Sequence, residues 1–299
     1  MKHITYILFL TLLFSCKKEI EFKIPNEERI LVVNSNLCAD SFISVKLTYT
    51  QSINDNSKPI TENNAIVELF SKDTILLETL NPRINGFYQT TFFKAEASKS
   101  YILKISTPQK VYWMQDSCPL KCSAALVKTD SIFFQGKSNF FRIKYQLTDL
   151  QLCSNYYGLK LKHSYETYLV NGGGAIDTAL VEEWIDVETI DPLLIQDENN
   201  KFSKKHILFS DLYFNNSTIY FSFGTSAISN TATKKTKKLS IELEQYSYDS
   251  YLYYASLIEH MFYQNDPFSQ PTLVKGNISN ALGSFIGKDI NRTIILFKY

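Results

Sequence analysis

The chain has 299 residues and is close to neutral, with 31 lysines and arginines against 30 aspartates and glutamates. Proteins that bind nucleic acid present basic patches to the phosphates, so this balance excludes nucleic acid as a partner. Aromatic residues make up 14% of the chain, led by 21 phenylalanines and 19 tyrosines. This composition favours β-strands, whose aromatic side chains fill a sheet core or form a platform for sugars or siderophore-like ligands.

Residues 1–15 have the pattern of a secretory signal peptide. Lys2 supplies a positive charge, and an apolar stretch of eleven residues follows from Ile4 to Phe14. A bilayer takes about 20 apolar residues to span, so this stretch is too short for a transmembrane helix, but it suits the apolar region of a signal peptide.

The end of this stretch, Leu13-Phe14-Ser15-Cys16, resembles the lipobox of bacterial lipoproteins. By that resemblance, a peptidase cuts before Cys16 and the new N-terminal cysteine carries fatty acyl chains such as palmitate. Two or more chains anchor a protein stably, because each buried CH₂ contributes about 0.8 kcal/mol. The alternative is an ordinary signal peptide with an incidental cysteine.

Residues 16–28 are charged and contain Pro25, which is typical of a tether between an anchor and a folded domain. The segment Lys17–Glu21 loosely resembles the signal that sends Bacteroidota lipoproteins to the cell surface. We therefore expect a lipid-anchored protein of the outer membrane that faces outwards rather than towards the periplasm.

Four further cysteines, Cys38, Cys118, Cys122 and Cys153, enter an oxidising compartment on export, where disulfides persist. An extended chain holds the Cα atoms of Cys118 and Cys122 about 13 Å apart, beyond disulfide reach. A bridge from Cys38 to one of these two and free buried thiols both remain open.

Residues 29–121 show strand patterns throughout. Apolar and polar residues alternate over residues 43–49, and the same alternation recurs at 65–69 and 101–105, with turn-rich breaks between them. Short strands at this spacing predict an immunoglobulin- or fibronectin-like β-sandwich, with Trp113 in its core.

A second alternating series predicts a larger β-domain at residues 122–299. One helix is expected within it at residues 247–263, with Ser247 as N-cap and Pro267 beyond its end. The chain is therefore expected to be all-β (mainly β), with two β-sandwich domains, the second carrying one amphipathic helix. The apolar face of the helix either plugs the sheet or docks a partner, and its residues are Tyr251, Tyr254, Ala255, Ile258, Met261 and Phe262.

Sequence motifs give no support for an enzyme. The chain has no nucleophile elbow, zinc-protease motif, phosphate loop or dinucleotide fingerprint. His163, His206 and His260 are too far apart for a local metal site, so we expect neither a metal nor a cofactor.

Two charged clusters have both a possible functional role and a purely structural explanation. Glu182, Glu183 and Asp186 flank Trp184 and are candidates for catalytic carboxylates, although charges at a strand edge are commoner. The lysine-rich segment 234–238 reads as a charged hairpin tip, or as a contact with anionic lipid.

The C-terminal region carries a resemblance to a known family. Its stretches Asn265–Pro271 and Gly276–Phe285 resemble a pattern near the C-terminus of the domain-of-unknown-function 4249 family. Members of this family are lipoproteins of the Bacteroidota. Asp266 departs from the usual asparagine, and Ser279-Asn280-Ala281 stand where the family tends to glycine. Further agreement covers the mature chain, at Ile24-Pro25, Leu31–Val33, Gly86–Tyr88, Tyr101–Leu103 and Leu208–Phe214.

This resemblance implies an accessory or substrate-binding subunit, without catalytic activity, beside a TonB-dependent receptor, for a small ligand that the sequence does not identify. A structural or adhesive cell-surface protein is the alternative, because sandwich folds serve many functions. The family brings no established site residues, and the candidate interaction loop consists of Asp266, Pro267, Phe268, Asn277, Ile278, Leu282, Gly283 and Phe285.

Overall fold

The computed structural model describes residues 28–297, apart from 53–54, 56, 150–152, 171–175, 196–199, 201, 229–230, 232–233, 265, 267 and 271. The predicted signal peptide, the acylation site Cys16 and the tether up to residue 27 lie outside the described residues, and so does Pro267. No described helix has the length and apolar character needed to cross a membrane.

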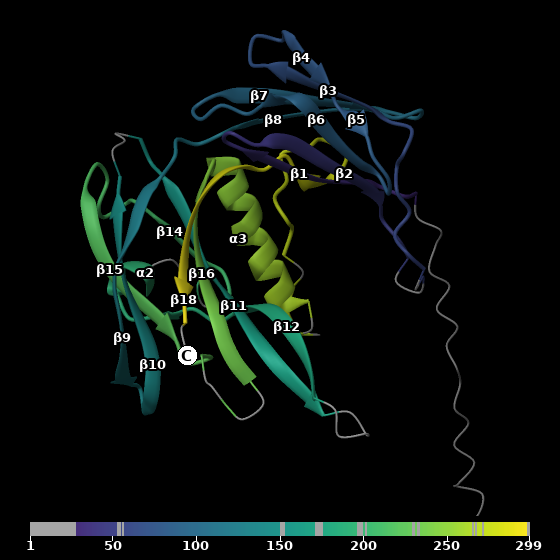
Figure 1. The fold of residues 1–299 in the computed structure, drawn as a ribbon. Coiled ribbons are helices and arrows are strands. Elements are labelled where there is room, and N and C mark those ends of the chain that lie inside the picture. The colour runs from purple at the N-terminus through teal and green to yellow at the C-terminus, as the bar shows by residue number, and fades with distance from the viewer. Residues whose placement is uncertain are drawn as a thin grey trace, which may run out of the picture.

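The N-terminal half is a β-sandwich, drawn in purple and blue in Figure 1. Its predicted alternation is confirmed, because Ile43, Val45 and Leu47 are fully buried between the two layers. One layer contains β1 (Leu31–Cys38), β2 (Phe42–Tyr49), β6 (Phe87–Lys94) and β5 (Asn81–Pro82). The other contains β4 (Leu76–Thr79), β3 (Ile66–Ser71), β7 (Ser100–Ser106) and β8 (Val111–Ser117).

The second half also packs two layers around an apolar core, which includes Tyr145, Tyr157, Phe221 and Phe223. One layer contains β13 (Glu188–Thr189), β15 (Thr218–Thr225), β10 (Lys137–Thr148) and β9 (Ser123–Phe134). The other contains β12 (Ile176–Ile185), β11 (Tyr156–Val170), β16 (Lys234–Tyr246) and β18 (Gly287–Leu296), with β14 (Ile207–Ser210) paired to β11. A one-turn helix, α2 (Pro192–Ile195), precedes β14. The all-β class is confirmed.

The two halves share one sheet. Strand β18 runs parallel to β1, with Leu37 opposite Gly287 and Cys38 opposite Lys288, and β17 (Leu282–Ser284) also pairs with β1. One sheet of ten strands therefore runs through both halves of the described chain. The C-terminal segment also contributes Ile278 and Phe285 to the N-terminal core.

A buried carboxylate, Asp116, ties three elements together at this junction. Its Oδ2 atom accepts hydrogen bonds from Ser247 Oγ (2.9 Å), Ser250 Oγ (2.7 Å) and the Gly287 amide (2.8 Å). Burial raises the pKa of Asp116, against the lowering effect of these hydrogen bonds. The end of β8, the start of the long helix and the start of β18 are thereby fixed to one another.

The long helix α3 (Tyr248–Tyr263) begins at the predicted N-cap, since the Ser247 side chain accepts from the Ser250 amide. It lies against β11 and β16 in Figure 1. The predicted inward face is partly wrong, because Met261 and Phe262 are more than half exposed. Ser250 and Ser256 are buried instead, and their hydroxyls are satisfied by Asp116, by the Leu252 carbonyl and by the Lys275 amide.

Trp113 was expected in the core, and that expectation is wrong. Its neighbours Tyr112 and Met114 point into the sandwich, so the two-residue period of β8 directs Trp113 to the outer face. Its side chain is 53% exposed there.

Candidate functional site

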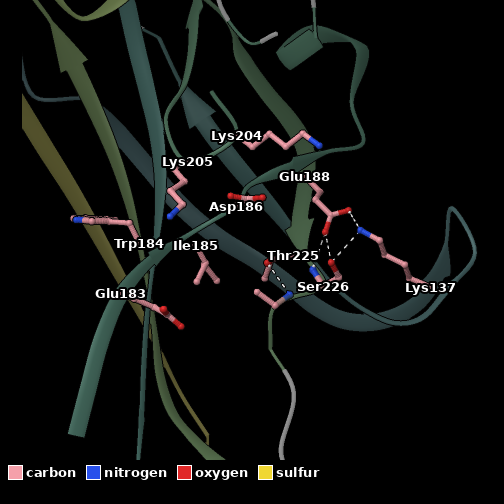
Figure 2. Close-up of a pocket in the computed structure, with 11 residues that line it drawn as sticks. Lys137, Glu183, Trp184, Ile185, Asp186, Glu188, Lys204, Lys205, Thr225 and Ser226 are labelled. Atoms are coloured by element: carbon pink, nitrogen blue, oxygen red, sulfur yellow. Dashed lines mark hydrogen bonds and ion pairs between the residues drawn. The ribbon is translucent and has the colours of Figure 1, made fainter. Parts of the chain in front are cut away.

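A cavity of about 320 Å³ opens at one end of the second sandwich (Figure 2). Its walls come from the end of β12, from β13, from the end of β15, from the start of β10 and from the loop before β14. The polar lining is charge-balanced and includes Lys137, Lys204, Lys205, Glu183, Asp186 and Glu188.

Glu188 is held as an anion in this cavity. Lys137 Nζ donates to Glu188 Oε2 at 2.7 Å, and the amide and hydroxyl of Ser226 donate to Oε1. Burial raises the pKa of Glu188, but these donors outweigh it and hold the pKa below its usual value. An anion fixed in this way is a weak general acid, which needs a raised pKa.

The acidic residues around Trp184 do not converge on one point. Successive side chains of a strand point to opposite faces, so β12 places Glu182 and Glu183 on opposite sides of the sheet. Trp184 shares the face of Glu182, beneath Lys160 and Lys162, and in Figure 2 it points away from Asp186. Glu182 therefore does not face the cavity that Glu183 and Asp186 line.

The negative charge of Glu182 is compensated by neighbouring lysines. Its carboxylate accepts from Lys162 (2.6 Å), Lys238 (3.1 Å) and Ser164 (2.9 Å). Hydrogen bonds from Lys162 and Ser164 lower its pKa to about 2. The side chain is a structural ion-pair partner on the sheet surface.

The lysines of segment 234–238 belong to β16 and not to a hairpin tip, which corrects the sequence interpretation. Lys234 Nζ lies 3.8 Å from the Tyr165 ring centroid, Lys237 pairs with Glu166 at 2.9 Å and Lys238 pairs with Glu182. These charges are matched by acidic and aromatic side chains of neighbouring strands, because the ladder places the partners side by side.

The three histidines lie in separate environments. His206 Nε2 lies 2.9 Å from Tyr246 Oη, and burial lowers the His206 pKa to about 3. His163 Nε2 lies 3.1 Å from Thr236 Oγ1, and burial lowers the His163 pKa to about 4. His260 Nδ1 lies 2.8 Å from the Thr272 carbonyl. Within the described part of the chain, no three His, Cys, Asp or Glu side chains are close enough to hold a metal ion.

Beneath α3 lies a buried charge cluster around Glu244 that the sequence did not single out. Lys160 Nζ and Lys288 Nζ approach its carboxylate at 2.7 and 3.0 Å, and Tyr246 donates its hydroxyl to it. Burial raises the pKa of Glu244, but Lys288 and Lys160 outweigh it and lower the pKa to about 2. Only the strand register, which no local pattern reveals, brings these residues together.

Residues 277–285 of the candidate C-terminal loop form a structural frame that fixes the chain to the N-terminal sandwich. Asn277 donates to the Phe285 carbonyl and accepts from the Phe285 amide, both at 2.8 Å. Ile278 and Phe285 are buried in the N-terminal core, while Leu282 is half exposed and pairs with β1. Gly283 has φ +92°, and a Cβ there overlaps a carbonyl oxygen of β1.

The other end of the loop is exposed. Asp266 accepts from the Phe268 amide at 3.0 Å and from the Ser269 hydroxyl, and these bonds lower the Asp266 pKa. The Phe268 side chain is 96% exposed. The structure thus separates the candidate loop into a frame at 277–285, which Ile278 and Phe285 anchor in the N-terminal core, and a solvent-facing tip around Phe268.

Cys38, Cys118 and Cys122 are free thiols, and Cys153 is exposed. Cys118 and Cys122 are buried, and burial raises the pKa of each to about 12. Cys118 Sγ lies 3.8 Å from the Lys288 carbonyl, so this thiol packs at the junction of the two halves. A thiol in such a site is unreactive.

Comparisons with known proteins give one decisive result. The family model described as "Domain of unknown function (DUF4249)" matches residues 17–293. No curated protein matches. Among solved structures, one described as "Biofilm associated protein - BSP domain" aligns with 88% of this chain at 6% identity and a TM-score of 0.20, and the chain spans 58% of that structure's length. A likeness this slight carries no functional argument. The family match covers nearly the whole sequence, and the chain therefore belongs to the DUF4249 family.

Proposed function

We propose that this protein is a lipid-anchored, non-catalytic accessory subunit of an outer-membrane uptake system that works beside a TonB-dependent transporter. Acylated Cys16 ties the chain to the membrane, residues 16–28 form the tether, and the two sandwiches stand at the cell surface. The protein contacts a small ligand or the transporter there and needs no cofactor.

The observation that carries this proposal is a concentration of exposed apolar side chains at the end of α3 and just after it. Met261, Phe262, Phe268 and Leu273 are all more than half exposed within residues 261–273. The segment is held at one end by α3 and at the other by the Asn277 frame. Exposed apolar side chains gathered in one place are typical of a contact surface.

The state of two carboxylates supports the non-catalytic part. Glu188 in the cavity and Glu182 on the sheet surface both have lowered pKa values, because lysines and serine donors stabilise their anions. Glycoside hydrolysis requires a carboxyl group that holds its proton near neutral pH.

Fractionation of cells tests the anchor. Cys16→Ser is expected to move the protein from the membrane fraction to the soluble fraction, because the acyl chains supply the membrane affinity. Retention of this variant in the membrane contradicts the anchoring at Cys16.

Growth of a deletion strain tests the uptake role. We expect loss of growth on one class of nutrient among peptides, glycans and chelated iron, with normal attachment to surfaces. Complementation with Phe268→Ser should restore growth less well than complementation with Phe133→Ser, a matched change of an exposed phenylalanine on β9. Normal growth with lost attachment favours the adhesive alternative instead.

A further inference from the structure

The outer face of the sheet β4-β3-β7-β8 is more apolar than an ordinary solvated face. Antiparallel strands with one solvated face alternate apolar and polar residues, whereas strands covered on both faces are apolar almost throughout. Here the inward residues are nearly all apolar, and about half of the outward ones are apolar as well, between polar ones such as Glu68, Lys104, Ser106 and Gln115. The outward apolar side chains are Ile66 and Phe70 of β3, Leu76 of β4, Ile102 of β7, and Val111 and Trp113 of β8.

Trp113 has the largest apolar side chain of this face and lies on its edge strand β8. Strands β3 and β8 lie on either side of β7, so their backbones are about 9.5 Å apart. The ring centroids of Phe70 and Trp113 are nevertheless 5.9 Å apart, which requires the two rings to lean towards each other over β7. The two aromatic rings therefore form one apolar cluster above β7.

The two charged side chains of this face, Lys104 and Glu68, form an ion pair with each other. Lys104 Nζ lies 2.7 Å from Glu68 Oε2 and 5.5 Å from the Trp113 ring centroid. The register sets this charged row between two mixed rows, one of Ile66, Ser106 and Val111 and the other of Phe70, Ile102 and Gln115. A partner for this face needs apolar area and no net charge.

These features favour a protein over a sugar or a bilayer. The aliphatic side chains Ile66, Leu76 and Val111 have no groups that can hydrogen-bond to sugar hydroxyls. Hydrocarbon offers the Lys104–Glu68 pair no hydrogen-bond partner, whereas the backbone and neutral polar groups of a protein surface do. A large half-exposed tryptophan beside further exposed apolar side chains is typical of a protein interface.

The tether limits where that protein can be. Cys16 and Glu28 are twelve residues apart, so even a fully extended tether spans only about 43 Å. Glu28 lines a surface cavity of the N-terminal sandwich together with Tyr49 and Tyr112, so it lies directly against that sandwich. The sandwich therefore stays close to the membrane, and this step rests on the proposed acylation of Cys16.

We propose that the outer face of β4-β3-β7-β8 is the docking surface for the extramembrane part of an integral outer-membrane protein with an apolar, uncharged contact surface. In the framework of the proposed function, this face is where the transporter binds, and the segment 261–273 remains available for the ligand.

Site-specific crosslinking in living cells tests the docking surface. A photo-crosslinking phenylalanine analogue replaces Val111 in one strain and Phe133 in a control strain, both on exposed strand positions. We expect the probe at position 111 to crosslink an integral outer-membrane protein identified by mass spectrometry, and the probe at position 133 not to do so. In parallel, Trp113→Ala should reduce co-purification of that protein about tenfold or more, the usual scale for a hot-spot tryptophan, while Phe133→Ala leaves it unchanged.

Other outcomes separate the two proposals. Crosslinks at position 111 only to a second copy of the chain, or to no protein, overturn the docking surface. Co-purification of the transporter that Trp113→Ala does not weaken also overturns it but leaves the uptake role standing. A crosslinked membrane protein unrelated to uptake supports the docking surface and overturns the uptake role. Thermal unfolding of the Trp113→Ala protein checks that its fold is intact.

Discussion

Replacing Glu244 by glutamine should destabilise the fold strongly. The Glu244 side chain is 1% exposed and faces the ammonium groups of Lys160 and Lys288 at 2.7 and 3.0 Å. The amide keeps the shape but removes the charge, which leaves two lysines without their counter-ion beneath α3. Removing one partner of a buried ion pair costs about 3–5 kcal/mol.

The chain offers a matched control in Glu182. Its carboxylate also lies between two lysines, Lys162 and Lys238, on the same sheet, but the side chain is 35% exposed. Water screens exposed pairs, so E182Q should leave the free energy of unfolding nearly unchanged. Urea unfolding of both variants, followed by intrinsic fluorescence, gives the comparison. An equal effect of E244Q and E182Q refutes the reasoning.

The same cluster should make the stability of the fold depend on pH in the acid range. The pKa of Glu244 is lowered to about 2 in the folded protein, so its contribution to stability is present above its ordinary pKa of about 4.5 and is lost as the pH falls towards 2. The difference in unfolding free energy between wild type and E244Q should therefore shrink between pH 4.5 and 2. A difference that does not change over this range contradicts the lowered pKa.

Two further predictions concern the backbone and the thiols. Gly283→Ala should lower the midpoint of thermal unfolding far more than Gly136→Ala. Both glycines have positive φ, but of the two only Gly283 has a carbonyl oxygen where the new Cβ must go. Equal shifts contradict the close approach of Gly283 to β1. In native protein, a maleimide should modify Cys153 first, because it is exposed, while the buried Cys118 and Cys122 should react only after unfolding. Mass spectrometry of labelled peptides measures the order of modification. Early labelling of Cys118 contradicts its burial.

Local periodicity predicted the strands and the start of the helix because those features depend on neighbouring residues. The alternation over residues 43–49 matches the buried face of β2, and Ser247 is the N-cap of α3. The same rule failed for Trp113, since a two-residue period distinguishes the two faces of a strand but not which face is covered.

Long-range pairing explains what the sequence did not reveal. Strands β1 and β18 are separated by about 250 residues, and no local pattern marks them as neighbours in one sheet. The Glu244 cluster depends in the same way on the pairing of β16 with β11 and β18, and the Asp116 junction joins β8, α3 and β18. Likewise, the inward face of α3 includes serines because Asp116 and the Lys275 amide satisfy their hydroxyls, which a search for apolar residues overlooks.

The candidate site shows the same limit. Sequence proximity suggested that Glu182, Glu183 and Asp186 act together, but the strand turns the first two to opposite faces of the sheet. The residues of the family-like C-terminal segment were grouped as one candidate interaction loop, but residues 277–285 hold the chain to β1, while the tip around Phe268 is exposed.

The most direct test of the central claim is purification of the tagged protein from detergent-solubilised outer membranes, followed by identification of the proteins that accompany it. An accessory subunit of an uptake system is expected to bring a TonB-dependent transporter with it in comparable amount. Repeated recovery of the protein alone, under conditions that keep other membrane complexes intact, contradicts the account.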